Sequence, residues 1–269
     1  MYKDFWNLRE LPFESSPNPR FIYLSKQHDE ALARMRYVVE QNKGAGELVG
    51  IFGCGKTILV NTLMEKLESD IYKISYITNP RLNDVDILRM IIHHLCSEEK
   101  IPINKADLLI KLEEVMINNA QDGKKNLIII DEAHAIEEKN IFEELRLLMN
   151  FQYNNTFLSN LLLIGQPPLN KKIEDIKQFT QRIYMRFSLK ELHRDEVFEY
   201  IAHRLEVAGG SVDIFTPDAV DLIQRHSGGL PRRINHICDM CLFTGFLKKT
   251  NMITTDVVKE ACDSLAGEA

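Results

Sequence analysis

Residues 50–57 read G-I-F-G-C-G-K-T and fit the pattern G-x-x-x-x-G-K-[ST] without a gap. Glycines at 50, 53 and 55 permit a tight turn that brings backbone N–H groups close to an anion. Because a predicted helix begins at Ile58, these groups lie at a helix N-terminus, which favours negative charge. In this pattern Lys56 reaches the β- and γ-phosphates, and the hydroxyl of Thr57 holds Mg²⁺. The stretch therefore predicts a phosphate loop; the alternative is a glycine-rich turn that binds nothing.

A second informative run, N-L-I-I-I-D at 126–131, is followed directly by Glu132. Four consecutive apolar residues are typical of a strand buried on both faces of a parallel sheet. Acids at the end of such a strand suit a Mg²⁺-bound nucleotide. Asp131 would hold the metal through its water shell, and Glu132 would polarise the attacking water as general base. The alternative, two acids that mark an exposed strand end, loses weight because a phosphate loop lies upstream.

These two runs together predict a site for ATP and Mg²⁺. The residues expected to contact the nucleotide are Gly50, Phe52, Gly53, Cys54, Gly55, Lys56, Thr57 and Ile58, and the expected metal ligands are Thr57 and Asp131. The letters D-E-A-H at 131–134 also occur in a class of helicases. The chain lacks room for two tandem motor domains, so we reject that interpretation.

The composition describes a globular protein with a sizeable core. The chain has 269 residues, of which 45% are apolar and 27% charged, enough for two domains. The net charge of −6 does not point to nucleic-acid binding, although a local basic patch or an assembled ring would still permit it. No apolar run approaches the roughly 20 residues that cross a bilayer. The charged N-terminus does not resemble a signal peptide, so we expect a cytoplasmic location.

The five cysteines are scattered and form no disulfide framework. Cys238 and Cys241 make a lone C-x-x-C inside a helical pattern. Because a metal site would need a second pair, we expect both to be core residues. Cys54, inside the phosphate loop, is expected to be a small filler; sensitivity to oxidation is the alternative.

The pattern changes near residue 190, which predicts an α/β domain over 1–190 and a helical domain over 191–269. Helix and strand signals alternate in the first part; the expected strands are 46–50, 71–77, 126–131, 161–164 and 187–189, and the expected helices 27–41, 58–67, 84–96, 106–119 and 141–150. Four helices follow, beginning near Asp195, Pro217, Pro231 and Thr255. The segment 1–26 is rich in proline and aromatic residues, so we expect it to lack regular structure and to pack on the α/β domain or on an adenine ring.

Five further side chains are candidates for the site. Gln166 follows strand 161–164 and is placed to orient water or to touch the γ-phosphate; a loop amide with only local hydrogen bonds is the alternative. Arg182 and Arg186 lie in Q-R-I-Y-M-R-F before a short strand, where either is suited to reach a neighbouring subunit's nucleotide. Arg232 and Arg233 open a helix, where cations are unfavourable unless an anion faces them. A nucleotide phosphate would be that anion, and a solvated pair is the alternative.

Together these residues resemble the AAA+ ATPases, and among them the family of general secretion pathway protein A (ExeA). Pilus-associated and transposition ATPases share the same core. The motifs that carry the resemblance, in order, are P-F-x-x-x-P-N-P-R-F-I-Y-L-S-x-Q-H-x-E-A-L at 12–32, G-C-G-K-T, L-I-I-I-D-E-A-H, L-L-L-I-G-Q-P-P-L, Q-R-I-Y-M-R-F and S-G-G-L-P-R-R-I-N. They span nearly the whole chain, and their order and spacing make the match more specific than any single motif.

The resemblance implies a P-loop α/β fold with a five-stranded parallel sheet flanked by helices, followed by a small all-helical lid. Ligands of such sheets lie at the carboxyl ends of the strands. By motif position, Gln166 is similar to the sensor-1 residue, Arg232 to the sensor-2 arginine and Arg182 to the arginine finger, with Arg186 as the alternative. An arginine supplied in trans makes hydrolysis of ATP to ADP and phosphate depend on assembly into a ring or filament.

Secretion members of this family often carry a transmembrane helix and a periplasmic domain after the ATPase, whereas this chain ends at Ala269 with neither. We therefore expect a soluble regulator, cytoplasmic or peripheral to the inner membrane. The leading hypothesis is an oligomerising ATPase that serves a membrane-associated secretion, surface-polysaccharide export or pilus system. One alternative is an ATP-dependent, DNA-binding regulator of transposition; another is a nucleotide switch that barely hydrolyses. The basic clusters available for DNA are Lys171, Lys172, Lys248 and Lys249.

Overall fold

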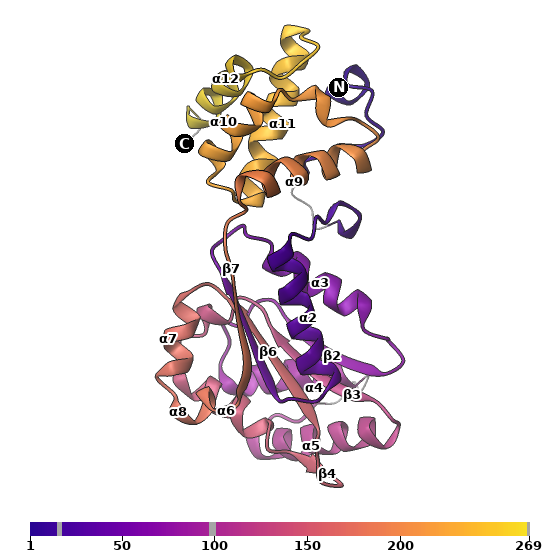
Figure 1. Ribbon diagram of the computed structural model, residues 1–269. Helices are drawn as coiled ribbons and strands as arrows, with labels where there is room; N and C mark the ends of the chain where they lie inside the picture. The colour runs from indigo at the N-terminus through magenta and orange to yellow at the C-terminus, as the bar shows by residue number, and fades with distance from the viewer. Residues whose placement is uncertain (15–17, 97–100, 268–269) are drawn as a thin grey trace. The chain divides into compact units, whose positions relative to one another are not determined.

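The computed structural model describes residues 1–14, 18–96 and 101–267 (Figure 1). The chain divides into two compact units. An α/β unit comprises His28–Phe52 and Leu59–Leu189. A helical unit comprises Met1–Gln27, Gly53–Ile58 and the residues from Lys190 onward.

The α/β unit is built on a five-stranded parallel sheet, as the sequence predicted. Its strand order is β2-β3-β6-β1-β7. The strands are β1 (Ala45–Gly50), β2 (Tyr72–Ile77), β3 (Lys125–Ile130), β6 (Ser159–Gly165) and β7 (Ile183–Leu189). The central strands β1, β3 and β6 are almost wholly buried, which explains the continuous apolar runs of β3 and β6.

Helices flank this sheet (Figure 1). They are α2 (Lys26–Glu40), α3 (Lys56–Lys66), α4 (Asp84–Leu95), α5 (Lys105–Gln121), α6 (Lys139–Leu148), α7 (Pro168–Glu174) and α8 (Lys177–Thr180). Asn83 caps the N-terminus of α4, because its side chain accepts a hydrogen bond of 2.8 Å from the backbone N–H of Asp86. Ile91 of α4, Leu112 of α5 and Phe142 of α6 pack with the strands in one core.

Several short elements of the α/β unit were not predicted. They are α7, α8, the one-turn 3₁₀ helix η2 (Ala133–Ala135) and a hairpin formed by β4 (Gln152–Tyr153) and β5 (Thr156–Phe157). Each is too short to show a hydrophobic period. The hairpin turn uses Asn154 and Asn155 with positive φ angles of 49° and 60°, the conformation that two-residue hairpin loops require.

The helical unit contains four long helices: α9 (Arg194–Val207), α10 (Pro217–Ser227), α11 (Pro231–Lys248) and α12 (Thr255–Ala266). The short helices α1 (Tyr2–Phe5), η1 (Pro19–Phe21) and η3 (Val212–Ile214) complete it. Thr216 caps α10 by accepting a hydrogen bond of 3.3 Å from the N–H of Ala219. Cys238 and Cys241 are fully buried in the core of this unit, as the sequence indicated.

The N-terminal segment was expected to pack on the α/β domain, and this prediction is wrong. Its aromatic side chains belong to the core of the helical unit. The indole N–H of Trp6 donates to the carbonyl of Leu242 at 2.9 Å. The guanidinium of Arg204, on α9, donates to the carbonyls of Pro12 at 2.6 Å and Glu14 at 3.1 Å. Four helices alone leave an apolar face open, and this segment covers it.

Candidate nucleotide-binding site

The predicted site residues follow strands that end at the same edge of the sheet. In the parallel register Val49 pairs with Gly165, and Ile130 pairs with Leu163. The strand ends that lead to the phosphate loop, to Asp131 and to Gln166 are therefore adjacent. This is the edge at which open α/β sheets bind ligands.

The phosphate loop has the backbone that its glycines predicted. Gly53 and Gly55 have φ angles of +84° and +102°, which side chains other than glycine rarely adopt. Helix α3 begins at Lys56, so the loop ends at the N-terminus of an 11-residue helix. Lys56 is only 5% exposed. Burial raises the pKa of the Cys54 thiol despite the nearby Lys56 ammonium, which suits the filler role better than a reactive one.

The first turn of α11 contacts the phosphate loop inside the helical unit. The backbone N–H of Arg232 donates to the carbonyl of Gly53 at 3.3 Å. A Cβ atom at position 53 would lie 3.0 Å from the Cβ of Arg232. The structure therefore brings the predicted sensor-2 arginine to the loop.

Asp131 is 3% exposed and its carboxylate is held from two sides. The hydroxyl of Tyr76, on the neighbouring strand β2, donates to Oδ2 at 3.1 Å, and the N–H of Glu132 donates to Oδ1 at 2.8 Å. Burial and the adjacent Asp131 raise the pKa of Tyr76 far above its ordinary value, so the phenol keeps its proton and remains a donor. Tyr76 was not among the predicted site residues; its signal in the sequence is a polar side chain near the carboxyl end of the strand beside the acid-bearing one.

Glu132 has a φ angle of 52°, a left-handed conformation that costs a residue with a side chain about 1 kcal/mol. Such strain is typical of functional sites. Oε2 of Glu132 lies 3.4 Å from Nδ1 of His134. The backbone N–H of Gln166 donates to the same nitrogen at 3.3 Å. The predicted base and the predicted sensor-1 residue therefore meet at one histidine.

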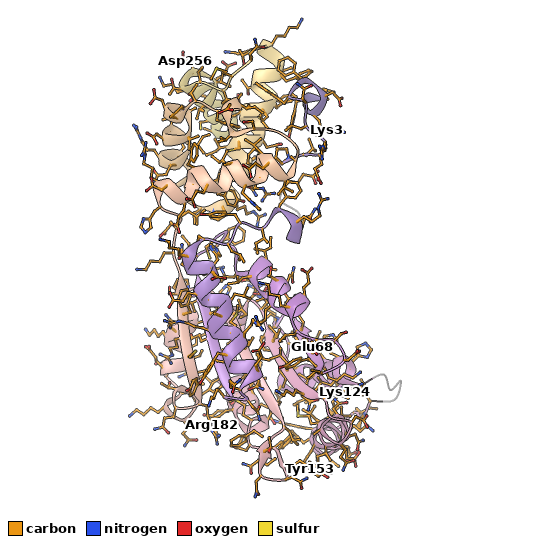
Figure 2. The ribbon with its side chains drawn as sticks, turned by 45° about the vertical axis from the view of Figure 1, so that its right-hand side comes forward. Lys3, Glu68, Lys124, Tyr153, Arg182 and Asp256 are labelled. Carbon is orange, nitrogen blue, oxygen red and sulfur yellow. The ribbon has the colours of Figure 1, made fainter. Side chains whose placement is uncertain are left out.

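The structure places Arg182 at the opposite edge of the sheet. It immediately precedes β7, whose first residue Ile183 pairs with the first residue of β1. Nη2 of Arg182 donates to Oδ1 of Asn150 at 2.5 Å, and the guanidinium lies 5.6 Å from the centre of the Phe157 ring. Figure 2 shows it at the same end of the α/β unit as Tyr153. Arg182 is therefore separated from Asp131 and Gln166 of its own chain.

Arg186 was expected to precede a short strand, but β7 begins earlier than predicted and Arg186 lies within it. Its Nε is 3.0 Å from Oε2 of Glu47, and its Nη1 is 3.3 Å from Oε1 of Glu174. The Glu47 side chain, on β1, is completely buried. Burial raises its pKa to about 7, although Arg186 opposes the shift. Because these two ion pairs hold Arg186 within its own chain, it is the weaker candidate for the arginine finger.

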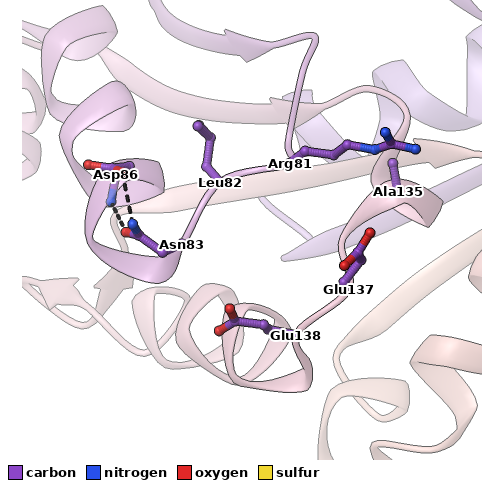
Figure 3. A pocket seen from close by; sticks show the side chains of 7 residues that line it. All are labelled: Arg81, Leu82, Asn83, Asp86, Ala135, Glu137 and Glu138. Carbon is purple, nitrogen blue, oxygen red and sulfur yellow. Dashed lines mark hydrogen bonds between the residues drawn. The ribbon is translucent and has the colours of Figure 1, made fainter.

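A separate cavity of about 330 Å³ lies between the segment after β2 and the segment after η2 (Figure 3). Its lining residues are Arg81, Leu82, Asn83, Asp86, Ala135, Glu137 and Glu138. None of the predicted nucleotide or metal residues is among them. Within the described ranges, no group of three or more His, Cys, Asp and Glu side chains is placed to hold a metal ion. No helix of the described chain is both long and apolar enough to cross a membrane.

Comparisons with known proteins agree with this architecture. Residues 39–173 match the family described as AAA domain. The chain is 36% identical over 274 residues to general secretion pathway protein A of Aeromonas hydrophila; the match covers 99% of this chain and 49% of that protein. A second relative, an uncharacterised HTH-type transcriptional regulator of Methanocaldococcus jannaschii, is 29% identical over 174 residues, which are 62% of this chain and 42% of that protein. The chain thus spans about half the length of the curated relatives it matches.

Among solved structures, the Aeropyrum pernix ORC2 protein in its ADPNP–ADP complexes aligns with a TM-score of 0.69 at 20% identity, covering 93% of this chain and 70% of that chain. At this identity the likeness shows the fold alone. It agrees with the five-stranded parallel sheet and the helical region that follows it. The resemblance seen in the sequence motifs is thereby confirmed: the chain belongs to the AAA domain family, as a P-loop AAA+ ATPase related to general secretion pathway protein A.

Proposed function

We propose that this chain hydrolyses ATP to ADP and phosphate with Mg²⁺, as an assembly of several copies. The observation that carries the proposal is the common edge of β1, β3 and β6, from which the phosphate loop, Asp131, Glu132 and Gln166 all depart. Lys56 is assigned to the β- and γ-phosphates, Glu132 to the attacking water, and Gln166 to the γ-phosphate or that water.

The oxygen donors present fit Mg²⁺, which prefers hydroxyl, carboxylate and water oxygens. Thr57 lies in the first turn of α3, and the Asp131 carboxylate is already oriented by Tyr76. These two residues would hold the ion, which would neutralise charge on the phosphates. Tyr76 acts indirectly, because it fixes the rotamer of Asp131 through its hydroxyl.

Hydrolysis is tested by comparing wild type with Glu132→Gln in steady-state assays with Mg²⁺ and with EDTA. We expect the variant to bind a fluorescent ATP analogue normally and to lose at least about 100-fold in kcat, the range for loss of a general base. His93→Ala, an exposed histidine of α4, is the control. A Glu132→Gln variant with the wild-type kcat would refute the role of Glu132 as general base. Equal wild-type rates with Mg²⁺ and with EDTA would refute the requirement for the metal.

The position of Arg182, at the edge of the sheet opposite to Asp131 and Gln166, supports assembly. We propose that Arg182 acts on the nucleotide of a neighbouring copy, in a ring or filament. A mixing experiment is the sharpest test. Glu132→Gln and Arg182→Ala are each expected to be nearly inactive alone. In a mixture, some interfaces combine an intact Glu132 with an intact Arg182, so activity should reappear.

Arg89→Ala, a half-exposed arginine of α4, should retain wild-type activity in the same assays. If the mixture is no more active than the sum of its parts, Arg182 does not act in trans.

The similarity to general secretion pathway protein A supports the proposal that this ATPase acts for a membrane-associated secretion, polysaccharide-export or pilus system. It would do so at the cytoplasmic side of the inner membrane. Co-purification with membranes, in the presence and absence of the neighbouring gene products, tests this.

DNA binding is disfavoured, because two of the four candidate lysines are engaged. Nζ of Lys172 donates to the carbonyls of His134 and Ile136, and Lys248 pairs with Glu260. ATP-dependent DNA retention at low salt would reverse this preference.

A further inference from the structure

His134 faces two partners that make opposite demands on a single ring nitrogen. The backbone N–H of Gln166 points at Nδ1 from 3.3 Å and needs a lone pair there. The carboxylate of Glu132 lies 3.4 Å from the same Nδ1 and needs a proton there. An imidazole nitrogen carries either a lone pair or a proton, so both bonds cannot exist together.

The surrounding contacts keep this histidine in place. Lys172, on α7, donates from Nζ to the carbonyls of His134 at 2.6 Å and Ile136 at 2.5 Å. A Cβ atom at Gly165 would lie 3.2 Å from the backbone nitrogen of His134. The loop after β3 and the loop after β6 are thus joined closely, and the imidazole is 19% exposed. A displacement of one loop would therefore disturb the contacts of the other.

We propose that His134 is a positioning residue that links the loop of Gln166 to the base Glu132. While Nδ1 accepts the N–H of Gln166, it carries no hydrogen and cannot donate to Oε2 of Glu132, so the carboxylate is available to the substrate water. When the Gln166 loop moves away, the tautomer of His134 that carries its hydrogen on Nδ1 can donate to the Glu132 carboxylate, which withdraws the base. The charged groups near His134 are the Glu132 carboxylate and the Lys172 ammonium, with Asp131 three residues upstream.

This inference rests on the proposed hydrolysis, and it predicts a graded series of variants. In His134→Asn the side-chain oxygen occupies the place of Nδ1 and can accept from Gln166, so activity should stay within about threefold of wild type. His134→Ala and His134→Leu remove the acceptor, and kcat should fall roughly 10-fold to 100-fold, as when a group that orients a catalytic residue is lost. KM and the affinity for a non-hydrolysable ATP analogue should not change, because no nucleotide contact is removed.

A double-mutant cycle distinguishes positioning from a general structural role. If His134 acts through Glu132, His134→Ala should add little to the defect of Glu132→Gln. His93→Ala serves as the matched control.

Additive losses in the cycle, an Asn variant as inactive as the Ala variant, or an Ala variant with wild-type kcat would each overturn the assignment of His134. A wild-type protein that hydrolyses no ATP would refute the proposed function itself, and this inference with it. The wild-type rate therefore separates the two failures.

Discussion

The buried carboxylate of Glu47 gives a quantitative prediction for how the stability of the α/β unit depends on pH. Glu47 lies in the middle of β1, the strand that leads into the phosphate loop, and its side chain is fully buried. Neither carboxylate oxygen has a well-aligned hydrogen bond within the described part of the chain. Its ion pair with Arg186 reduces the cost of burial but does not remove it, because its pKa is still raised from 4.5 to about 7.

The raised pKa fixes the sign of the pH dependence. In the unfolded chain Glu47 ionises near its ordinary pKa, whereas in the folded protein it keeps its proton until about pH 7. The folded state therefore binds more protons between these values, and stability falls as the pH rises through this window. The interval from 4.5 to about 7 corresponds to about 3 kcal/mol at most.

Glu47→Gln imitates the protonated form at every pH. We expect its free energy of unfolding to equal that of wild type below about pH 5 and to exceed it by about 3 kcal/mol above pH 7. Urea titrations followed by circular dichroism, at intervals from pH 5 to pH 8.5, measure this difference. Trp6, the single tryptophan, lies in the core of the helical unit, so its fluorescence in the same titrations follows that unit separately.

The control is Glu174→Gln, which removes the exposed partner of Arg186 and should change stability by less than about 1 kcal/mol. A Glu47→Gln variant that is less stable than wild type at pH 8 would refute the reasoning, because the ion pair with Arg186 would then outweigh desolvation. A difference that does not vary with pH would show that Glu47 does not titrate in this window.

Three further predictions concern the site and the helical unit. Lys56→Ala should weaken ATP binding by about 100-fold in calorimetry, because a charged donor to phosphate is worth up to about 3 kcal/mol, with an unchanged circular dichroism spectrum. Gly53→Ala should weaken binding at least about tenfold, since position 53 has a φ of +84° and its new Cβ would meet Arg232 at 3.0 Å; wild-type affinity would show that the loop adapts. Arg204→Ala should destabilise the helical unit by about 3 kcal/mol, because two backbone carbonyls lose a charged donor, and limited proteolysis should then release the N-terminal segment that contains Trp6.

The sequence alone predicted the parallel sheet, the phosphate loop and the acids after β3. These features depend on local rules: a continuous apolar run makes a buried strand, and glycines at fixed spacing make an anion-binding turn. For the same reason the starts of α10 at Pro217 and of α11 at Pro231 were predicted correctly.

Only the tertiary structure decided which side chains meet. The N-terminal aromatics show no period that names their partner, and the fold places them in the helical unit. Arg182 and Arg186 are four residues apart, yet packing sends one to the edge of the sheet and pairs the other with buried Glu47. The meeting of Glu132, His134 and Gln166 joins loops about 30 residues apart. Such contacts depend on strand order, and strand order is set by the packing of the whole sheet and not by any short stretch of sequence.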